Sequence, residues 1–446
     1  MLTTAEAAKQ LGISQRRVQE LIKSGLLPAQ KVSGIWLLDE ESVRARFLTV
    51  DKRGGRPRRG KSRYEHTFTL MNRTHEIVSV IYSTSRKDFV SIGSEVNAVH
   101  APIGLATLDG RIPLEAFRNW WRGRGIPMAR VGLTALLTAA GVDVPDELIQ
   151  RNLGLSLSDQ YWIKPTGTDL KWEDINFFNN DFERVSLATQ PYAVEGQSAP
   201  ARPDNTSDGN LQKYWSCENE LRVLHKGGIH LGQEPYNEVV ATALHGRLLG
   251  EDEFVPYSLE GSGSTATCRS DDFLSDEEEY VPAFYVDKVI PKTTSDGGFE
   301  HYLACCEQLG VVNARGALNR MITCDDILAN YDRHWRNFGI VRNVNTLECR
   351  PAPLFDSGSS LWCNVSLDAL MAGEHSFSSA QFHPSPAKQM LLVDDLSWFS
   401  SEAMDGFVDE AIGILSGNEA ITPRLPYIRK AVTWRVNRMI DIAEWS

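Results

Sequence analysis

The sequence predicts an α+β protein in which a small winged helix-turn-helix domain precedes a larger body of two lobes. Three observations support this class. Two short amphipathic helical segments and a hairpin-like stretch fill residues 1–47. Between residues 211 and 290, short runs rich in β-branched and aromatic residues surround one helical segment. In the last third of the chain, His301–Leu309, Ala317–Ala329 and much of Ala403–Trp445 are helical in pattern.

Charge is distributed unevenly along the chain. The 446 residues, enough for two to four domains, carry a formal net charge of -12. Residues 1–63 hold 14 Lys and Arg against 6 Asp and Glu, a balance of +8, which leaves the remainder near -20. Residues 1–63, the head, are thus basic, and residues 64–446, the body, are acidic. This difference indicates an anionic partner for the head alone.

The cysteines and the apolar segments indicate the cellular compartment of the protein. Seven Cys is an odd number, and their spacing fits no metal motif. Adjacent Cys305 and Cys306 are expected at buried helix positions. We expect a reducing, cytoplasmic environment and no contact with a membrane, because neither a signal peptide nor a membrane-length apolar run is present in the sequence.

The first two helices are predicted from their caps and their apolar spacing. Thr4 is expected to cap a helix over Ala5–Leu11, and Ser14 a second helix from Gln15 to about Ser24. A glycine follows each helix and ends it. Residues Lys31–Leu38, with Gly34 near the middle, suit a short hairpin.

A last helix, capped by Asp39, is expected to run through Arg46. This order of helices and hairpin resembles the excisionase and MerR type of DNA-binding domain, here over residues 1–50. The resemblance implies that the second helix lies in the major groove of DNA. The candidate base contacts at its start are Gln15, Arg16, Arg17 and Gln19. The alternative is that the two arginines are only solvated.

Residues 51–63 are predicted to be a linker. Seven of the twelve residues from Lys52 to Arg63 are basic and none is acidic, a composition that does not fold by itself. The segment is either a basic arm that adds phosphate contacts or a simple solvated tether.

Residues 64–200 are predicted to form an N-terminal subdomain of the body. Thr67–Met71 and Ile77–Tyr82 favour strands, and Leu114–Arg122 and Leu133–Ala140 favour helices. The aromatic residues between 161 and 182 are expected to brace the neighbouring lobe rather than to bind a ligand.

Asp332, Asn337 and Asp356 are the most informative residues of the chain. The first two are five positions apart, and Asp356 follows a strand-like run from Cys349 to Phe355. Phosphoryl transfer needs a carboxylate near the acceptor hydroxyl and oxygen ligands for Mg²⁺ on the phosphates. These residues supply those parts in order, although the same pattern also occurs in polar surface turns.

A lysine and a glutamate precede these residues in the order that ATP binding requires. Lys226 ends a strand over Glu220–Lys226, and Glu238 lies in a helix over Tyr236–Leu244. A strand lysine that contacts ATP phosphates and is paired to a helix glutamate is the kinase arrangement. Singly, each residue is more simply a solvated surface charge. Before them, the turn at Thr206–Asn210 carries a single glycine and gives a weak phosphate-loop signal.

From about residue 205 to the end, the chain resembles the HipA-like Ser/Thr kinases, the toxin component of bacterial toxin–antitoxin systems. The resemblance implies an ATP-binding lobe over residues 201–290 and a helical catalytic lobe over residues 291–446. It implies that Asp332 is the catalytic base and that Asn337 and Asp356 hold Mg²⁺. The ATP-binding residues that it implies are Ser207, Asp208, Gly209, Lys213, Lys226 and Glu238.

In that family a serine of the phosphate loop can be autophosphorylated, which inactivates the kinase. Thr206 and Ser207 are the nearest matches. The Asp-Arg-His…Asn order is also similar to phosphoinositide kinases, but Leu354-Phe355 before Asp356 departs from their pattern.

The sequence thus predicts an ATP- and Mg²⁺-dependent Ser/Thr protein kinase with a DNA-binding head. Its expected partners are a protein substrate and DNA, with a homodimer as a further expectation. The resemblance implies that the head regulates the kinase or its promoter. The alternatives are a DNA-binding regulator with a nucleotide-sensing body and a kinase that acts on a lipid or small molecule.

Overall fold

The chain forms two compact units, Met1–Arg63 and Tyr64–Ser446. The computed structural model describes residues 2–11, 14–23, 27–32, 35–39, 42–43, 64–127, 133–140, 142, 145–182, 203–206, 211–292, 298–373 and 375–445. Gly12, Gly25 and Gly34, the greater part of the helix expected up to Arg46, and the predicted basic linker lie outside these residues.

The N-terminal unit packs two helices against a small antiparallel sheet of order β1-β3-β2. Strands β2 and β3 form the expected hairpin, and its role as a wing stays a prediction. The core is apolar, with Ala7, Val18 and Leu38 fully buried. The elements are β1 (Leu2–Thr3), α1 (Thr4–Leu11), α2 (Gln15–Lys23), β2 (Ala29–Val32) and β3 (Ile35–Leu38).

The caps of these helices follow the sequence with one correction. Helix α1 begins at Thr4, so Thr3 caps it: Thr3 Oγ1 accepts from the Glu6 N–H (3.3 Å), and the Glu6 carboxylate accepts from the Thr3 N–H (2.8 Å). The prediction of Thr4 as the cap was wrong by one residue. The caps predicted at Ser14 and Asp39 are present, because Ser14 accepts from the Arg17 N–H and Asp39 from the Ser42 N–H.

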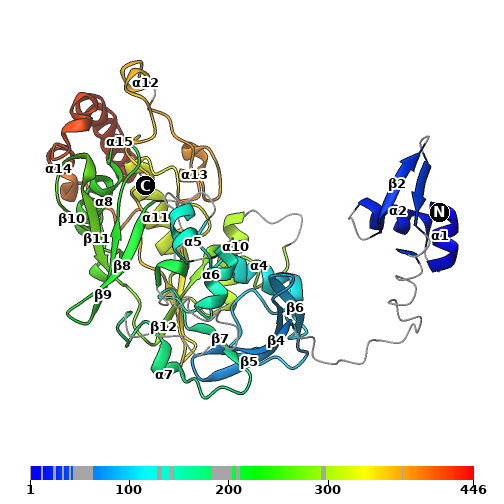
Figure 1. Cartoon of the computed structure of the whole chain (residues 1–446). Helices are drawn as coiled ribbons and strands as arrows, with labels where there is room; N and C mark the ends of the chain where they lie inside the picture. Colours follow the sequence, from blue (N-terminus) through cyan, green and yellow to red (C-terminus); the bar gives the residue numbers. More distant parts are fainter. Residues whose placement is uncertain are drawn as a thin grey trace. The chain divides into compact units, whose positions relative to one another are not determined.

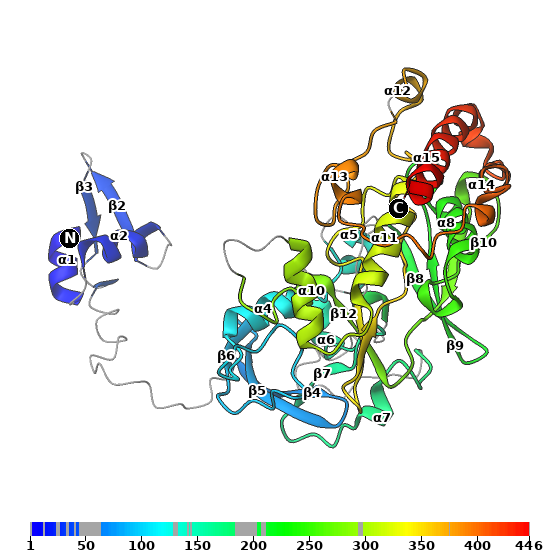
Figure 2. The same ribbon diagram turned by 180° about the vertical axis from the view of Figure 1, so that it is seen from behind.

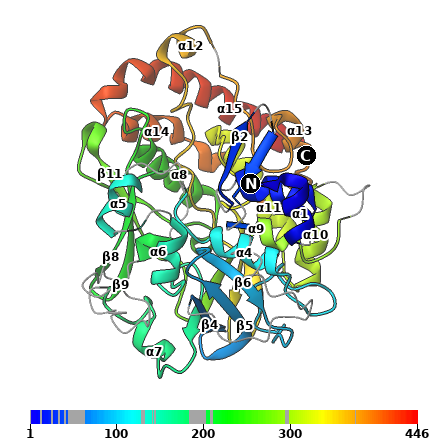
Figure 3. The same ribbon diagram turned by 45° about the vertical axis from the view of Figure 1, so that its right-hand side comes forward.

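The body begins with an antiparallel sheet of order β6-β5-β4-β7. Helix α4 packs on β6, and the rings of Phe89, Phe117 and Trp121 meet edge to face or stacked in the core between them. This sheet is visible beside α4 in Figure 3. The elements are β4 (Glu65–Asn72), β5 (His75–Ser83), β6 (Asp88–Ile92), α4 (Leu114–Arg122), α5 (Leu133–Ala140), α6 (Pro145–Arg151), β7 (Tyr161–Pro165) and α7 (Trp172–Ile175).

A second antiparallel sheet, of order β10-β11-β9-β8, is packed against the long helix α8 (Figure 1). Strand β9 begins at Leu221, which is exposed to solvent, and ends at Lys226, whose side chain is buried. The elements are β8 (Lys213–Glu218), β9 (Leu221–Lys226), α8 (Glu234–Leu248), β10 (Ser258–Glu260) and β11 (Thr267–Asp271), with 3₁₀ helices at Pro203–Thr206, Glu251–Glu253 and Gly263–Thr265.

The third sheet, of order β12-β13-β14, lies among the helices of the C-terminal half. Helix α11 contacts α10 and α15, and α14 links α15 to α8 (Figure 2). The strand expected over Cys349–Phe355 ends at Pro351. The elements are β12 (Glu278–Pro282), α9 (Ala283–Val286), α10 (Gly298–Gln308), α11 (Ala314–Leu328), β13 (Gly339–Asn343), β14 (Cys349–Pro351), α12 (Leu367–Met371), α13 (Pro386–Met390), α14 (Phe407–Leu415) and α15 (Leu425–Trp445), with 3₁₀ helices at Glu402–Met404 and Glu419–Arg424.

The α+β class is confirmed. Helices α4 and α5 have the predicted bounds, and Cys305 and Cys306 are buried in α10 as expected. In the part of the chain that the structure describes, no helix combines the length and the apolar character needed to cross a bilayer.

A buried polar cluster joins the first and third sheets. The Arg342 guanidinium on β13 donates to Glu279 Oε1 on β12 (2.8 Å) and to the hydroxyl of Tyr161 on β7 (2.6 Å). Asn72, at the end of β4, donates to the other oxygen of Glu279 (3.0 Å). Burial raises the pKa of Glu279, although Arg342 opposes the shift. The cluster therefore depends on Arg342 to keep a buried carboxylate compensated.

Replacing Arg342 with Ala is expected to lower the free energy of unfolding by about 3–5 kcal/mol, because the Glu279 carboxylate would remain buried without its cation. Arg350→Ala is the matched control in the same sheet, since Arg350 pairs with Glu278 at 2.8 Å but its side chain is 46% exposed. That loss should stay below about 1 kcal/mol. Denaturant unfolding measures both, and equal losses would contradict the role assigned to Arg342.

Candidate active site

The loop after α11 holds Asp332 and Asn337 in a fixed turn. The Asn330 side chain donates to Asp325 at 2.8 Å and accepts from the Asp332 N–H at 3.0 Å. The carbonyl of Asp332 then accepts from the His334 N–H (2.7 Å) and from the Asn337 side-chain amide (2.9 Å). Because the amide nitrogen of Asn337 is used in this turn, its oxygen is the atom that it offers to a ligand.

Arg333 ties this loop to the segment that carries Asp356. Its side chain is fully buried and pairs with Asp325 through two nitrogens at 3.0 and 3.1 Å. It also donates to the carbonyl of Asn337, to the carbonyl of Phe355, and to the hydroxyl of Ser357 at 2.9 Å. The planar guanidinium can make all these contacts at once, which an ammonium cannot.

Lys226 joins the predicted helix glutamate and the predicted Mg²⁺ ligand. Its ammonium donates to both Glu238 and Asp356. The exposed fraction of the side chain is 4% for Lys226, 2% for Glu238 and 28% for Asp356. The pairing of Lys226 with Glu238 expected from their order in the chain is thus present, and Asp356 lies beside it.

Helix α8 is fastened to the same segment by side chains at its start. The second oxygen of Glu238 accepts from the Ser357 N–H (2.9 Å). Asn237 donates to the carbonyls of Gly358 and Ser360, both at 2.8 Å. A Cβ on Gly358 would lie 3.1 Å from the carbonyl of Glu234 and 3.2 Å from Glu238, so the close approach of helix and segment favours glycine there.

The charges of the site are set by burial and by mutual pairing. Burial alone would lower the pKa of Lys226, but Asp356 and Glu238 outweigh it and hold that pKa well above its usual value. Burial alone would raise the pKa of Asp356, but the cations Lys226, Lys213 and Arg333 hold it well below the ordinary range. Burial raises the pKa of Asp332, and the Asp356 carboxylate acts in the same direction. Asp356 is therefore anionic, and Asp332 is the more basic of the two carboxylates.

Lys213, Lys226, Asn337 and Asp356 line one cavity, of about 200 Å³. Lys213 and Lys226 are register partners on β8 and β9, so their side chains leave the same face of the sheet. The remaining lining is largely apolar and aromatic, and Phe273 stacks on Phe355 at 5.4 Å between ring centroids. The apolar lining residues include Trp215 and Leu224 of the second sheet, Val255 of the segment before β10, Phe273 and Leu274 of the connector between β11 and β12, and Val281 of β12.

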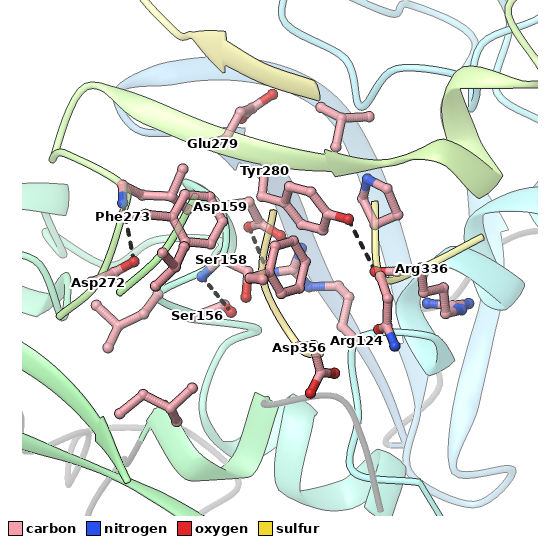
Figure 4. Close-up of a pocket in the computed structure, with 18 of the residues that line it drawn as sticks. Arg124, Ser156, Ser158, Asp159, Asp272, Phe273, Glu279, Tyr280, Arg336 and Asp356 are labelled. Atoms are coloured by element: carbon pink, nitrogen blue, oxygen red, sulfur yellow. Dashed lines mark hydrogen bonds and ion pairs between the residues drawn. The ribbon is translucent and has the colours of Figure 1, made fainter. Parts of the chain in front are cut away.

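The connector between β11 and β12 forms one wall of this cavity. Asp272 Oδ1 accepts from the Leu274 N–H at 3.1 Å, and burial raises the pKa of Asp272 to about 8. Beside this connector, where its ring packs edge to face on Phe273, Tyr280 donates to the carbonyl of Arg336 at 3.0 Å (Figure 4). The cavity therefore combines the lysine side chains of Lys213 and Lys226 with aromatic rings, which suits a phosphorylated aromatic ligand.

Some residues that the sequence predicts for the site are not among the described residues that line the cavity. Asp332 is not among the described residues that line the cavity, although it shares a turn with Asn337, which does. Ser207, Asp208 and Gly209 lie outside the described residues, and only the backbone of Thr206 is described, at the end of a 3₁₀ helix. The supporting roles of Asp325, Asn330 and Arg333 were not predicted, because Asp325 and Asn330 carry no motif of their own.

The start of α2 presents arginine side chains outward. Arg16 is 90% exposed and Arg17 62% exposed, and both lie near Glu20, at 3.7 and 2.8 Å. Gln19 is exposed as well. The side chain of Gln15 instead donates to Thr4 Oγ1 at 2.9 Å, so this residue joins α2 to α1.

Comparison with known proteins identifies the head and gives two similar structures for the chain. Residues 1–48 match the family model of a helix-turn-helix domain. No curated protein matches the chain. The proinflammatory kinase CtkA of Helicobacter pylori is 17% identical with a TM-score of 0.40, over 52% of this chain and 94% of its own.

The second structure is a chain of the Shewanella oneidensis MR-1 toxin–antitoxin complex of HipA, HipB and operator DNA. It is 12% identical with a TM-score of 0.46, over 84% of this chain and 98% of its own. At such scores the activity of the chain has to be inferred from its own side chains.

Arg333→Lys is expected to lower the free energy of unfolding by more than about 2 kcal/mol, because a lysine cannot replace the hydrogen bonds to Asp325, the two carbonyls and Ser357. Arg429→Lys is the control, since Arg429 is 45% exposed and pairs with Asp409 at the surface. The control should change stability by less than about 0.5 kcal/mol. Chemical denaturation compares the two, and a neutral Arg333→Lys would contradict the bridging role.

Proposed function

We propose that the body of this chain is an ATP- and Mg²⁺-dependent kinase that phosphorylates Ser or Thr residues of a protein. The observation that carries the proposal is that Lys226, Asn337 and Asp356, from three separate segments, line one cavity. The ion pair of Lys226 with Glu238 supports it, because this pair holds the lysine at the cavity wall.

The side chains present fit ATP and Mg²⁺. Asn337 offers an amide oxygen and Asp356 an anionic carboxylate, the hard oxygen donors that Mg²⁺ prefers. Lys213 and Lys226 supply positive charge for phosphates, and the aromatic and aliphatic lining suits a purine. Bound Mg²⁺ would neutralise charge that develops on the transferring phosphoryl group.

Asp332 would orient the acceptor hydroxyl and take its proton late in the transfer. Its raised pKa makes it a better proton acceptor than an ordinary aspartate. The Asp332 N–H donates to the Asn330 side chain and the Asp332 carbonyl accepts from Asn337, so its backbone is fixed before substrate arrives, which favours a reactive orientation. Arg333 holds the two segments that carry Asn337 and Asp356 at a constant spacing.

The second candidate is a DNA-binding regulator whose body binds nucleotide without transferring phosphate. The observation that favours it is the position of Asp332 outside the cavity-lining set of described residues. A transfer assay separates the two candidates, because both bind nucleotide and only one consumes it.

The N-terminal unit would bind DNA through α2. A second helix that presents exposed arginines at its start is the arrangement by which helix-turn-helix domains contact the major groove. Because Gln15 is engaged with Thr4, the contacts would come mainly from Arg16, Arg17 and Gln19. The proposed function is thus that of a kinase whose own DNA-binding head brings it to a promoter.

Asp332→Asn is expected to reduce phosphoryl transfer from γ-labelled ATP at least about 100-fold while ATP binding persists, because the amide cannot accept the hydroxyl proton. Asp409→Asn, at a carboxylate that is 78% exposed, should leave transfer unchanged. Transfer is followed in cell lysate with protein and lipid fractions separated. Undiminished transfer by the Asp332→Asn variant would exclude this residue as the base, and label in lipid alone would exclude a protein substrate.

Arg16→Ala is expected to weaken binding to duplex DNA and to reduce the slope of log affinity against log salt by about 1, because one positive charge that releases counterions from the DNA is lost. Lys87→Ala removes the same charge from the body, where the lysine pairs with Glu147, and should leave the slope unchanged. Fluorescence anisotropy at several salt concentrations measures both. Identical slopes for the wild type and the Arg16→Ala variant would contradict the proposed interface.

A further inference from the structure

His230, Glu234 and Cys363 meet where the start of α8 approaches the segment after Asp356. One potential metal-ligand atom from each of the three lies within 4.8 Å of the other two. His230 and Glu234 are four positions apart, with Glu234 in the first turn of α8, whereas Cys363 lies far along the chain, beyond α11. The cluster is separate from the proposed nucleotide site, since none of its members lines that cavity among the described residues.

Two of the three side chains are buried and the third faces solvent. The exposed fraction is 2% for the Glu234 side chain and 5% for Cys363, against 41% for the His230 side chain. His230 and Cys363 also line a surface cavity of about 440 Å³. An ion could therefore enter from solvent, past the imidazole, and reach the thiol and the carboxylate.

The existing hydrogen bonds explain part of this arrangement. The Glu234 carboxylate accepts from the backbone N–H groups of Ile229 and His230 at 3.0–3.1 Å, which caps the turn before α8. It also contacts His230 Nδ1 at 2.6 Å, a distance at which one proton is shared. Capping accounts for the buried carboxylate, but it does not require an imidazole and a thiol beside it.

We propose that His230, Glu234 and Cys363 form a binding site for a borderline divalent transition ion such as Zn²⁺. Imidazole, carboxylate and thiolate are the ligand types that such ions take in proteins, whereas Mg²⁺ prefers oxygen donors alone. The ion takes the place of the proton between His230 Nδ1 and Glu234, so the neutral imidazole carries its proton on Nε2, and the proton of the Cys363 thiol leaves to solvent. Three protein ligands leave one position of a tetrahedral ion for water from the surface cavity.

The site would clamp the two elements that hold the proposed kinase residues. Helix α8 carries Glu238, and Cys363 follows the segment that begins at Asp356. The Cys363 sulfur also lies 3.6 Å from the hydroxyl of Tyr331, the residue before Asp332. An ion at this point adds a cross-link between α8 and the segment, so it is expected to raise the melting temperature of the chain.

Cobalt(II) is the probe for this site, because a thiolate ligand gives Co²⁺ a charge-transfer absorption that oxygen ligands do not give. The full chain, in excess Mg²⁺, is expected to bind one Co²⁺ with this absorption, and Zn²⁺ is expected to displace it. Cys363→Ser should abolish the absorption, while Cys217→Ser, at an exposed cysteine, should retain it.

Since Cys363 is buried and its variant could fail to fold, His230→Ala provides a second test at a half-exposed side chain. It should weaken Co²⁺ binding at least about tenfold with the fold intact by circular dichroism. No thiolate absorption in the wild-type chain would overturn the proposal. Absorption that is lost in Cys217→Ser instead of Cys363→Ser, or that His230→Ala leaves at full affinity, would also overturn it.

Discussion

A lysine ammonium that is taken out of water has to be matched by anions, and Lys226 is almost completely buried. The carboxylates of Glu238 on α8 and Asp356 beyond β14 compensate its charge. These three groups bring together a strand, a helix and a loop that are as much as 130 residues apart. Removing Lys226 would leave the buried Glu238 carboxylate without its cation, so the geometry at the cavity wall and the stability of the body depend on the same contacts.

Arg333 extends this compensation to the loop of Asp332. It is fully buried, it pairs with Asp325, and it donates to both segments that carry the oxygen ligands proposed for Mg²⁺. A cation between two loops holds their backbones at one spacing, which is what a metal site shared by those loops requires. The rigid parts of the site are thus built from ion pairs, while the purine side of the cavity is built from aromatic and aliphatic packing.

The sequence predicted more of the site than of its surroundings. The pairing of Lys226 with Glu238 could be predicted because strand, helix and order along the chain constrain it. The contact of Lys226 with Asp356 and the bridge at Arg333 could not, because they depend on how loops after β14 fold back onto α8 and α11. Helix bounds such as Leu114–Arg122 followed from apolar spacing, whereas the cap at Thr3 was missed because Thr4 is an equally good capping residue by type.

The central claim is that Lys226, Asn337 and Asp356 surround one magnesium–nucleotide. Its most direct test is calorimetric titration of the full chain with a non-hydrolysable ATP analogue, with and without Mg²⁺, for the wild type and an Asp356→Asn variant. Mg²⁺ is expected to tighten binding to the wild type, and this gain is expected to be largely lost in the variant. No binding of the analogue to the folded wild-type chain, or an equal gain from Mg²⁺ in both proteins, would contradict it.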